Sequence, residues 1–318
     1  MPARGGADLA PCCIDTCHPY LFSSRLGGYV KDRHLGYLFL APTAVAMLLV
    51  FVYPLLVSLW SSLHYDVFTQ PARYRFVGLQ NYVTVLKDAL FWSALRNSMI
   101  FFVATVAGTM VLGTTIALLL DRSLGRFNWV KTLYLLPMVV APVVVGIQWR
   151  FMLNYTFGVI PYFTKALHLP TKPWLTEPFS AMAWLILVDL WYYTPIVILL
   201  VSAGLTTVPV EVREAVKLDG ADALQTVRYI LLPILKPILV VALLIRTIGG
   251  LRAFDTIWVI TEGGPGRATE VANIFAYKLG FAFFDMGKAS AVAWLLLLIA
   301  VGVSGLYLRA LRGHTATL

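Results

Sequence analysis

The chain has little charge. Asp, Glu, Lys and Arg make up only 13% of its 318 residues, whereas hydrophobic residues make up 59%. A soluble domain averages about 25% charged residues, and the mean hydropathy of +0.78 points in the same direction. The composition therefore excludes an ordinary soluble domain and predicts an all-α, polytopic membrane protein.

Cysteine is also scarce. The three cysteines, Cys12, Cys13 and Cys17, cluster near the start of the chain with His18 beside them. Because no further ligands follow at metal-binding spacing, we interpret them as reduced thiols in a disordered arm. No apolar core of a signal peptide precedes the first long hydrophobic run, so we expect that run to be retained as a membrane span.

Catalytic motifs are missing as well. The chain has no G-x-x-x-x-G-K-[ST] phosphate loop, since the nearest string, Gly287–Ser290, lacks the first glycine and the adjacent hydroxyl. The five histidines are scattered. We therefore expect no catalytic residue, cofactor or metal site on this chain.

Long apolar runs are what the sequence has in their place. A membrane-spanning helix needs about 20 apolar residues. Six runs meet this need: Leu35–Trp60, Asn97–Leu120, Thr132–Trp149, Pro178–Leu205, Leu235–Ile260 and Ala289–Leu308. The first stands apart from the other five.

The net charge of +9 could indicate nucleic-acid binding, but the placement of the basic residues argues against it. They gather in residues 1–34, 121–131, 206–236 and 309–318, which six spans place on one side of the membrane. The positive-inside rule makes that side the cytoplasm, with both termini there. Residues 61–96, 154–177 and 261–287 are then external, although 61–96 itself carries four basic residues.

Charged residues also occur inside two of the spans. At 1.5 Å per residue, Asp189 and Arg246 each lie about 16 Å from opposite membrane faces, near the middle of a ~30 Å core. An uncompensated charge there is costly, so we predict that the two heads lie within about 4 Å or share one water. Arg252 and Asp255 are three residues apart, which predicts an intrahelical pair.

Aromatic residues surround these charges, and such rings beside hydrogen-bonding groups suit a sugar, which offers both C–H faces and hydroxyls. Structural pairing and core packing are the alternative interpretation. The candidate translocation path comprises Asp189, Trp191, Tyr192, Tyr193, Arg246, Arg252, Asp255 and Trp258.

A charged segment, 209–233, separates two apolar runs. Pro209 suits the first turn of a helix, and Gly220 can adopt the left-handed conformation that ends one. A second helix is expected from Ala221 or Asp222 to Leu232, with Pro233 ending it. Two short helices around a glycine corner would form a rigid knob.

The spacing of Glu214-Ala215-Val216, Gly220, Ile230 and Leu232-Pro233 resembles the "EAA…G…I-LP" loop of ABC importer permeases, with Val216 in place of an alanine. In that family the loop docks onto a cytoplasmic ATPase. The resemblance assigns ATPase coupling to Glu214, Ala215, Gly220, Ile230, Leu232 and Pro233.

Other strings resemble carbohydrate permeases of the MalF type: Phe76–Tyr82 ("F-x-G-L-x-N-Y"), Leu136-Pro137, Pro237 and Thr261–Pro265. The resemblance implies a type-I importer transmembrane domain over 95–306. A cytoplasmic arm (1–34), a first transmembrane helix (35–60) and an external segment (61–94) would precede it, and a cytoplasmic tail (307–318) would follow.

The resemblance further implies a permease that imports a sugar or related polyol across a bacterial or archaeal cytoplasmic membrane. Its partners would be a second homologous permease, two ATPase subunits that bind ATP and Mg, and an extracytoplasmic binding protein. The sugar contacts could lie wholly on the companion permease. Alternatives are a non-sugar importer, an ion-driven secondary transporter with Asp189 as its cation site, and a membrane scaffold.

Overall fold

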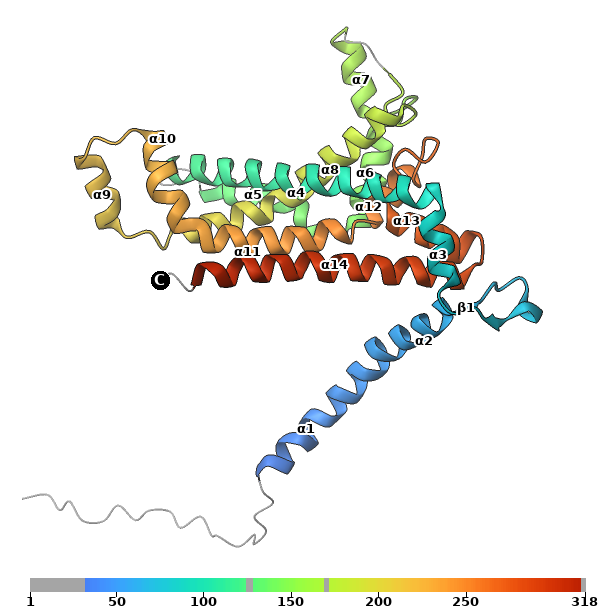
Figure 1. The fold of residues 1–318 in the computed structure, drawn as a ribbon. Coiled ribbons are helices and arrows are strands. Elements are labelled where there is room, and N and C mark those ends of the chain that lie inside the picture. Colours follow the sequence, from blue (N-terminus) through green and yellow to red (C-terminus); the bar gives the residue numbers. More distant parts are fainter. Residues whose placement is uncertain (1–31, 124–127, 169–171, 316–318) are drawn as a thin grey trace, which may run out of the picture. The chain divides into compact units, whose positions relative to one another are not determined.

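The computed structural model describes residues 32–123, 128–168 and 172–315. The predicted arm with Cys12, Cys13 and Cys17 lies outside these residues. The chain divides into two compact units, Met1–Leu55 and Leu56–Leu318. Nearly all regular structure in the described residues is helical, which confirms the predicted all-α class (Figure 1).

In the first unit, the described residues form one continuous apolar helix. It consists of α1 (Asp32–Met47), the π-helical η1 (Leu48–Val52) and the start of α2 (Tyr53–Ser62). Apolar side chains such as Phe39 and Phe51 are exposed. The stretch Phe39–Ser62 is long and apolar enough to cross a membrane, in agreement with the first predicted span.

The second unit holds the remaining elements. A small hairpin is followed by helices of very unequal length. They are β1 (His64–Tyr65), η2 (Pro71–Arg73), β2 (Arg75–Phe76), α3 (Gln80–Lys87), α4 (Ala89–Ser123), α5 (Asn128–Val139), α6 (Pro142–Met152), α7 (Val159–Ala166), α8 (Pro178–Leu205), α9 (Val210–Leu218), α10 (Ala223–Gln225), η3 (Thr226–Leu231), α11 (Leu232–Leu251), α12 (Asp255–Thr261), α13 (Ala272–Tyr277), η4 (Lys278–Ala282) and α14 (Met286–Thr315).

Five helical stretches among the described residues are long and apolar enough to cross a membrane: Phe39–Ser62, Ala89–Asp121, Pro178–Leu205, Ala223–Leu251 and Met286–Gly305. The predicted span Thr132–Trp149 is not a sixth such helix, because it is broken between α5 and α6. Pro142 begins α6 and holds Ala141 in an extended conformation with ψ 140°, as expected for the residue before a proline. Six spans result only if α5 and α6 count as one interrupted crossing.

The core of the second unit is formed where α4, α8 and α11 run along one another (Figure 1). The α4–α8 contact is close at Gly113, where an added Cβ would lie 2.6 Å from the Cβ of Val197. Buried aliphatic residues such as Val188, Val201 and Leu235 fill the space between these helices. This three-helix core carries the buried charges described below.

The F-x-G-L-x-N-Y string has a structural role at the hairpin. Its Asn81 amide donates to the backbone carbonyls of Ser62 and His64, both at 2.8 Å. The hydroxyls of Tyr82 and Ser62 lie 2.7 Å apart, and Gly78 has a φ of +57°. These contacts hold the hairpin β1–β2 and helix α3 against the end of α2.

Candidate functional site

The 209–233 segment begins with a short helix that ends at a glycine. Pro209 is the N-cap of α9, one position before the predicted first turn. Gly220, two residues after α9, has a φ of +68° and nothing within 4 Å of an added Cβ. A side chain there would be strained by the backbone alone. The predicted glycine corner is confirmed.

The second helix of the segment starts as predicted but does not end at Pro233. Asp222 and Gln225 form a capping box at its start, with bonds of 2.7 and 2.9 Å. The helix then continues through η3 and α11 to Leu251. In η3 the amide of Leu232 bonds five residues back, to Val227. This wider turn accommodates the ring and missing N–H of Pro233 that would break a regular helix.

An ion pair fixes α9 to the ends of two long helices. The Arg213 guanidinium contacts Asp121 of α4 through two bonds of 2.7 and 3.3 Å. It also donates to the carbonyl of Leu205, the last residue of α8, at 2.8 Å. The planar fork of arginine suits such multiple contacts. Arg213 therefore joins α9 directly to both α4 and α8.

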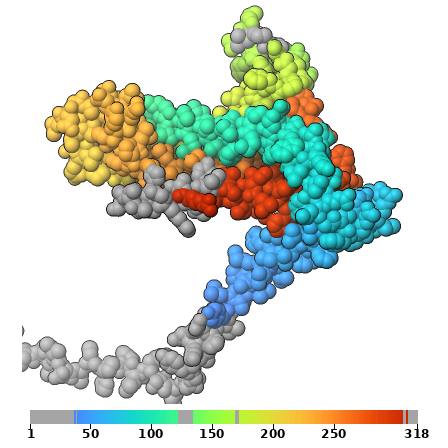
Figure 2. Space-filling model, viewed as in Figure 1, coloured from blue at the N-terminus to red at the C-terminus, as the bar shows by residue number. Residues whose placement is uncertain are grey.

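The opposite face of the 209–233 segment is exposed. Glu214, Ala215 and Gly220 lie on this surface. So does Leu218, with 89% of its surface exposed, and so do Leu224 and Tyr229. Val216, the departure from the family pattern, points inward and is buried. Figure 2 shows the segment, in yellow and orange, protruding at one end of the second unit.

The predicted pair of intramembrane charges is present. Arg246 Nη2 of α11 lies 2.6 Å from Asp189 Oδ2 of α8. Arg246 Nε donates to Thr109 Oγ1 of α4 at 3.0 Å, and its guanidinium lies over the Tyr193 ring at 4.4 Å. We call Thr109, Asp189, Tyr193 and Arg246 the charge cluster. It joins the three core helices through one buried arginine.

A cavity of about 280 Å³ lies beside the charge cluster. Four of the eight predicted path residues line it: Asp189, Tyr193, Arg252 and Asp255. Its walls combine two carboxylates, a guanidinium, a phenol and the apolar rings of Phe101 and Phe254. Such a mixture can hydrogen-bond hydroxyl groups and pack against C–H faces.

The other four predicted residues are placed differently. Arg246 belongs to the charge cluster but is not among the residues lining the cavity. The Tyr192 hydroxyl donates to the Val140 carbonyl at 2.8 Å. Trp258 stacks in parallel on Phe254 with ring centroids 6.0 Å apart. Trp191 is exposed and meets Trp149 edge-on at 5.5 Å. Of these four, Trp258 supports a cavity wall through Phe254.

The predicted intrahelical pair between Arg252 and Asp255 is wrong. Arg252 caps the end of α11, Asp255 begins α12, and Phe254 between them has a non-helical φ of −147°. The two residues therefore do not share a helix face, and no ion pair joins them in the described part of the chain. The break follows Gly249 and Gly250, since adjacent glycines weaken a helix. Both side chains reach the cavity instead.

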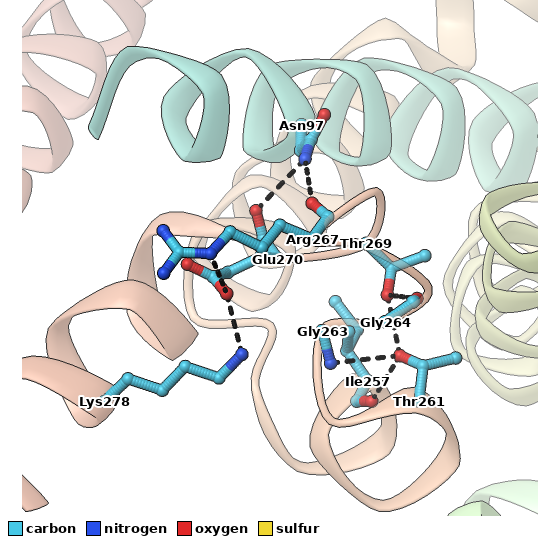
Figure 3. A network of polar contacts seen from close by, with 9 residues as sticks. All are labelled: Asn97, Ile257, Thr261, Gly263, Gly264, Arg267, Thr269, Glu270 and Lys278. Carbon is cyan, nitrogen blue, oxygen red and sulfur yellow. Dashed lines mark hydrogen bonds and ion pairs between the residues drawn. The ribbon is translucent and has the colours of Figure 1, made fainter. Parts of the chain in front are cut away.

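A second polar network fixes the loop Thr261–Glu270 (Figure 3). The Asn97 amide of α4 donates to the carbonyls of Arg267 and Glu270 at 3.1 and 3.2 Å. The buried Glu270 carboxylate is paired with Lys278 at 2.7 Å. Thr269 Oγ1 bonds to the Gly264 carbonyl at 2.6 Å and lies 2.7 Å from Thr261 Oγ1. The loop is thus bound to α4 through Asn97 and to η4 through Lys278.

Sequence reasoning missed Thr109 of the charge cluster and the anchor pair Asp121 and Arg213, as well as the network around Glu270. Thr109 follows Thr105 by four residues, which places two hydroxyls on one face of an apolar helix, and both are fully buried. Asp121 is the first charge after the second apolar run. These positions were visible in the sequence, but their partners were 92 and 137 residues away.

The fold and these sites define a class: a multi-span helical membrane protein with a polar cavity between its core helices and an anchored, exposed segment at one end. The chain belongs to the family of binding-protein-dependent transport system inner membrane components, whose sequence model matches residues 37–313. The predicted family resemblance is confirmed.

Several known proteins are similar over most of the chain. The trehalose/maltose transport system permease protein MalF of Thermococcus litoralis is 35% identical, over 88% of this chain and 94% of its own length. The trehalose transport system permease protein SugA of Mycobacterium tuberculosis is 33% identical, over 86% and 87%. The sulfoquinovosyl glycerol transport system permease protein SmoG of Agrobacterium fabrum is 32% identical, over 88% and 91%.

A solved structure shares the fold. A chain of a bacterial alginate ABC transporter, crystallised with its pentasaccharide-bound periplasmic protein, superposes with a TM-score of 0.76 at 22% identity. The match covers 87% of this chain and 94% of that one. The fold of this chain is therefore shared with a chain of an ABC transporter.

Proposed function

We propose that this chain is one of two homologous permease subunits in an ATP-driven importer for a sugar or related polyol. The names of its relatives, which transport trehalose, maltose and sulfoquinovosyl glycerol, support the substrate class. Two partner ATPase subunits would bind ATP and Mg, and an extracytoplasmic binding protein would deliver the substrate.

The carrying observation is the two-faced 209–233 segment. Its inner face is fixed to α4 and α8 through Arg213, while its outer face exposes Leu218, Leu224 and Tyr229 together with Glu214. An exposed apolar patch with a charged rim is typical of a protein interface. The proposed partner is the ATPase, whose closure would push α9 and rock the core helices between inward-open and outward-open states.

This assignment sets the orientation. The 209–233 segment would face the cytoplasm, as would both termini, and the Thr261–Glu270 loop would face outside. The basic residues of 206–236 fit this arrangement under the positive-inside rule. The membrane would be the cytoplasmic membrane of a bacterium or archaeon.

Substrate would pass beside the charge cluster. The cavity lined by Asp189, Tyr193, Arg252 and Asp255 offers hydrogen-bonding groups at the core of the bundle. The 2.6 Å contact of Asp189 with Arg246 disfavours the ion-driven alternative, because a bound guanidinium occupies the carboxylate that a coupling cation would need. The cavity itself disfavours a scaffold that only anchors a partner.

The test is purification of the tagged chain from its host membranes in mild detergent. The wild-type chain should bring an ATPase with it and support sugar uptake. Gly220→Val and Glu214→Lys should abolish uptake and reduce ATPase retention while leaving membrane insertion intact. Glu177→Lys, an equal charge change at an exposed residue at the other end of α8, is the control for retention. Normal uptake by either coupling variant would show that the assignment is wrong.

A further inference from the structure

A groove of about 840 Å³ lies between α4 and α8 at the end remote from the 209–233 segment. It shares no lining residue with the cavity beside the charge cluster. α8 lines it with apolar residues, whereas α4 contributes Ile100 and the polar Ser93, Arg96 and Asn97. At its mouth, Arg267 and its neighbours in the Thr261–Glu270 loop complete the lining. The groove is larger than the cavity beside the charge cluster, which measures about 280 Å³.

The mouth of the groove is positively charged. Arg96 of α4 is exposed there and forms no ion pair within the described residues. Arg267 lies 4.0 Å from Glu270, but that carboxylate is already paired with Lys278 at 2.7 Å. Nearby Glu177, outside the lining, lies 3.8 Å from Lys172. The positive charges of the two arginines are therefore not fully neutralised by these carboxylates and can attract an anionic ligand.

The Arg267 backbone is held in place by contacts within the protein. Its carbonyl accepts the Asn97 amide at 3.1 Å, and its φ is +69°. This holds the Arg267 backbone against α4 at Asn97, the residue that follows Arg96. Two guanidinium groups at one mouth are suited to phosphate oxygens, which arginine binds through paired hydrogen bonds.

Below the mouth the groove is apolar over the depth of one membrane leaflet. Its wall on α8 runs from Pro178 to Leu187 and includes Met182, Ala183 and Ile186. Nine residues of helix rise about 14 Å, which is about half of a ~30 Å hydrocarbon core. The cationic end then lies at headgroup level and the apolar end at the middle of the membrane.

We infer that this groove binds an anionic phospholipid. Arg96 and Arg267 contact its phosphate, and one acyl chain lies along Ile100, Met182 and Ile186. Basic pockets between membrane helices select anionic headgroups by the same chemistry. A sugar does not fit these walls, which offer few hydrogen-bond partners below the mouth. The proposed orientation places this groove in the outer leaflet. The site itself does not depend on that orientation.

The test is native mass spectrometry of the purified importer in neutral detergent with equal amounts of phosphatidylglycerol and phosphatidylcholine. Phosphatidylglycerol should be retained preferentially. Arg96→Gln with Arg267→Gln should weaken its binding about tenfold, the effect of losing charged hydrogen bonds. Arg75→Gln with Lys87→Gln removes two exposed charges outside the groove and should leave phosphatidylglycerol binding unchanged.

Two further measurements test the apolar part of the groove. Ala183→Phe should weaken the binding of long-chain phosphatidylglycerol although both arginines are intact. Glycerol phosphate, which has no acyl chain, should not bind.

Equal retention of the two lipids, or unchanged retention in the double-arginine variant, would overturn the inference. Binding of glycerol phosphate alone would replace the lipid with a free phosphate. A photo-crosslinker at Phe179, in the groove lining, extends the test to native membranes. A lipid adduct supports the site. An adduct to another subunit would show that the groove is a protein interface. ATPase retention is measured separately, so failure here leaves the proposed function standing.

Discussion

Asp189 and Arg246, 57 residues apart in sequence, meet at 2.6 Å between α8 and α11. Only 9% of the Asp189 side-chain surface and 2% of the Arg246 side-chain surface remain solvent-accessible. Each charge alone in the membrane core would be costly, and each relieves the desolvation of the other. Thr109 and Tyr193 occupy other directions around the guanidinium. The arginine thus fixes the relative positions of α4, α8 and α11.

A double-mutant cycle on this pair should be strongly non-additive. Asp189→Asn and Arg246→Gln each leave one uncompensated buried charge, and breaking such a pair costs about 3–5 kcal/mol. The double variant leaves none, so its loss should be smaller than the sum by about 0.5–3 kcal/mol. Thermal unfolding in detergent and uptake in membrane vesicles measure the two effects. Strictly additive losses would show that the pair contributes nothing beyond its separate residues.

Arg246→Lys provides the control for geometry. A lysine keeps the charge but has one ammonium, so it cannot reach Asp189 and Thr109 as the guanidinium does. Its stability should lie between wild type and Arg246→Gln. Wild-type stability would mean that charge alone, without the Thr109 contact, is sufficient.

This pair shows what the sequence can predict. Two opposite charges at equal depth in consecutive spans avoid exposure to lipid most simply by pairing with each other. The depth of the two residues therefore predicts the contact. Thr109 could not be assigned to it, because hydroxyls in apolar helices commonly bond their own backbone. Thr109 does so as well, at 2.7 Å to the Thr105 carbonyl.

The failed predictions all concern where helices stop. Pro233 was expected to end a helix, but the preceding π turn carries the helix past it. The sequence predicts one span over Leu235–Ile260, yet the helix ends at Leu251, directly after the adjacent glycines Gly249 and Gly250. Hydrophobic composition predicts which segments lie in the membrane, whereas local backbone hydrogen bonding determines where each helix ends.

The Arg213–Asp121 anchor should be required for coupling rather than for assembly. Asp121→Asn or Arg213→Gln frees α9 from α4, so ATPase motion would no longer reach the core. Within the proposed importer, we expect uptake to fall at least tenfold while the ATPase still co-purifies and hydrolyses ATP. The pair is partly exposed, with 35% and 18% of its side-chain surfaces accessible, so stability should fall by only about 1 kcal/mol.

Glu211→Gln is the matched control, since Glu211 is exposed on the same helix and likewise loses one charge. It should leave uptake unchanged. If Asp121→Asn and Glu211→Gln behaved alike, the anchor would have no special part in coupling.

The proposed orientation predicts a labelling pattern. In a chain lacking Cys12, Cys13 and Cys17, a single cysteine at Leu218 should react with an impermeant thiol reagent only in inverted vesicles. One at Tyr162 of α7 should react in intact spheroplasts. Leu218 is preferable to Gly220 because Gly220 has a φ of +68° and a side chain there would be strained. Labelling of Leu218→Cys in intact spheroplasts would refute the orientation.

The Thr261–Glu270 loop should depend on the Asn97 amide. Asn97 is buried and donates to two loop carbonyls, so Asn97→Ala leaves both without this donor at a cost of about 1–3 kcal/mol. Asn97→Asp has nearly the same shape but turns a carboxylate oxygen toward the carbonyls. It should therefore destabilise the protein at least as much as alanine does.

The apparent melting temperature in detergent measures this ranking, and limited proteolysis at Arg267 reports the loop directly. Both Asn97 variants should unfold at lower temperature and be cleaved faster. Ser93→Ala, an exposed position one turn earlier on α4, should do neither. If Asn97→Asp matched wild type in both assays, its amide would not be what holds the loop, because an aspartate differs from asparagine there only in lacking the donor and carrying charge.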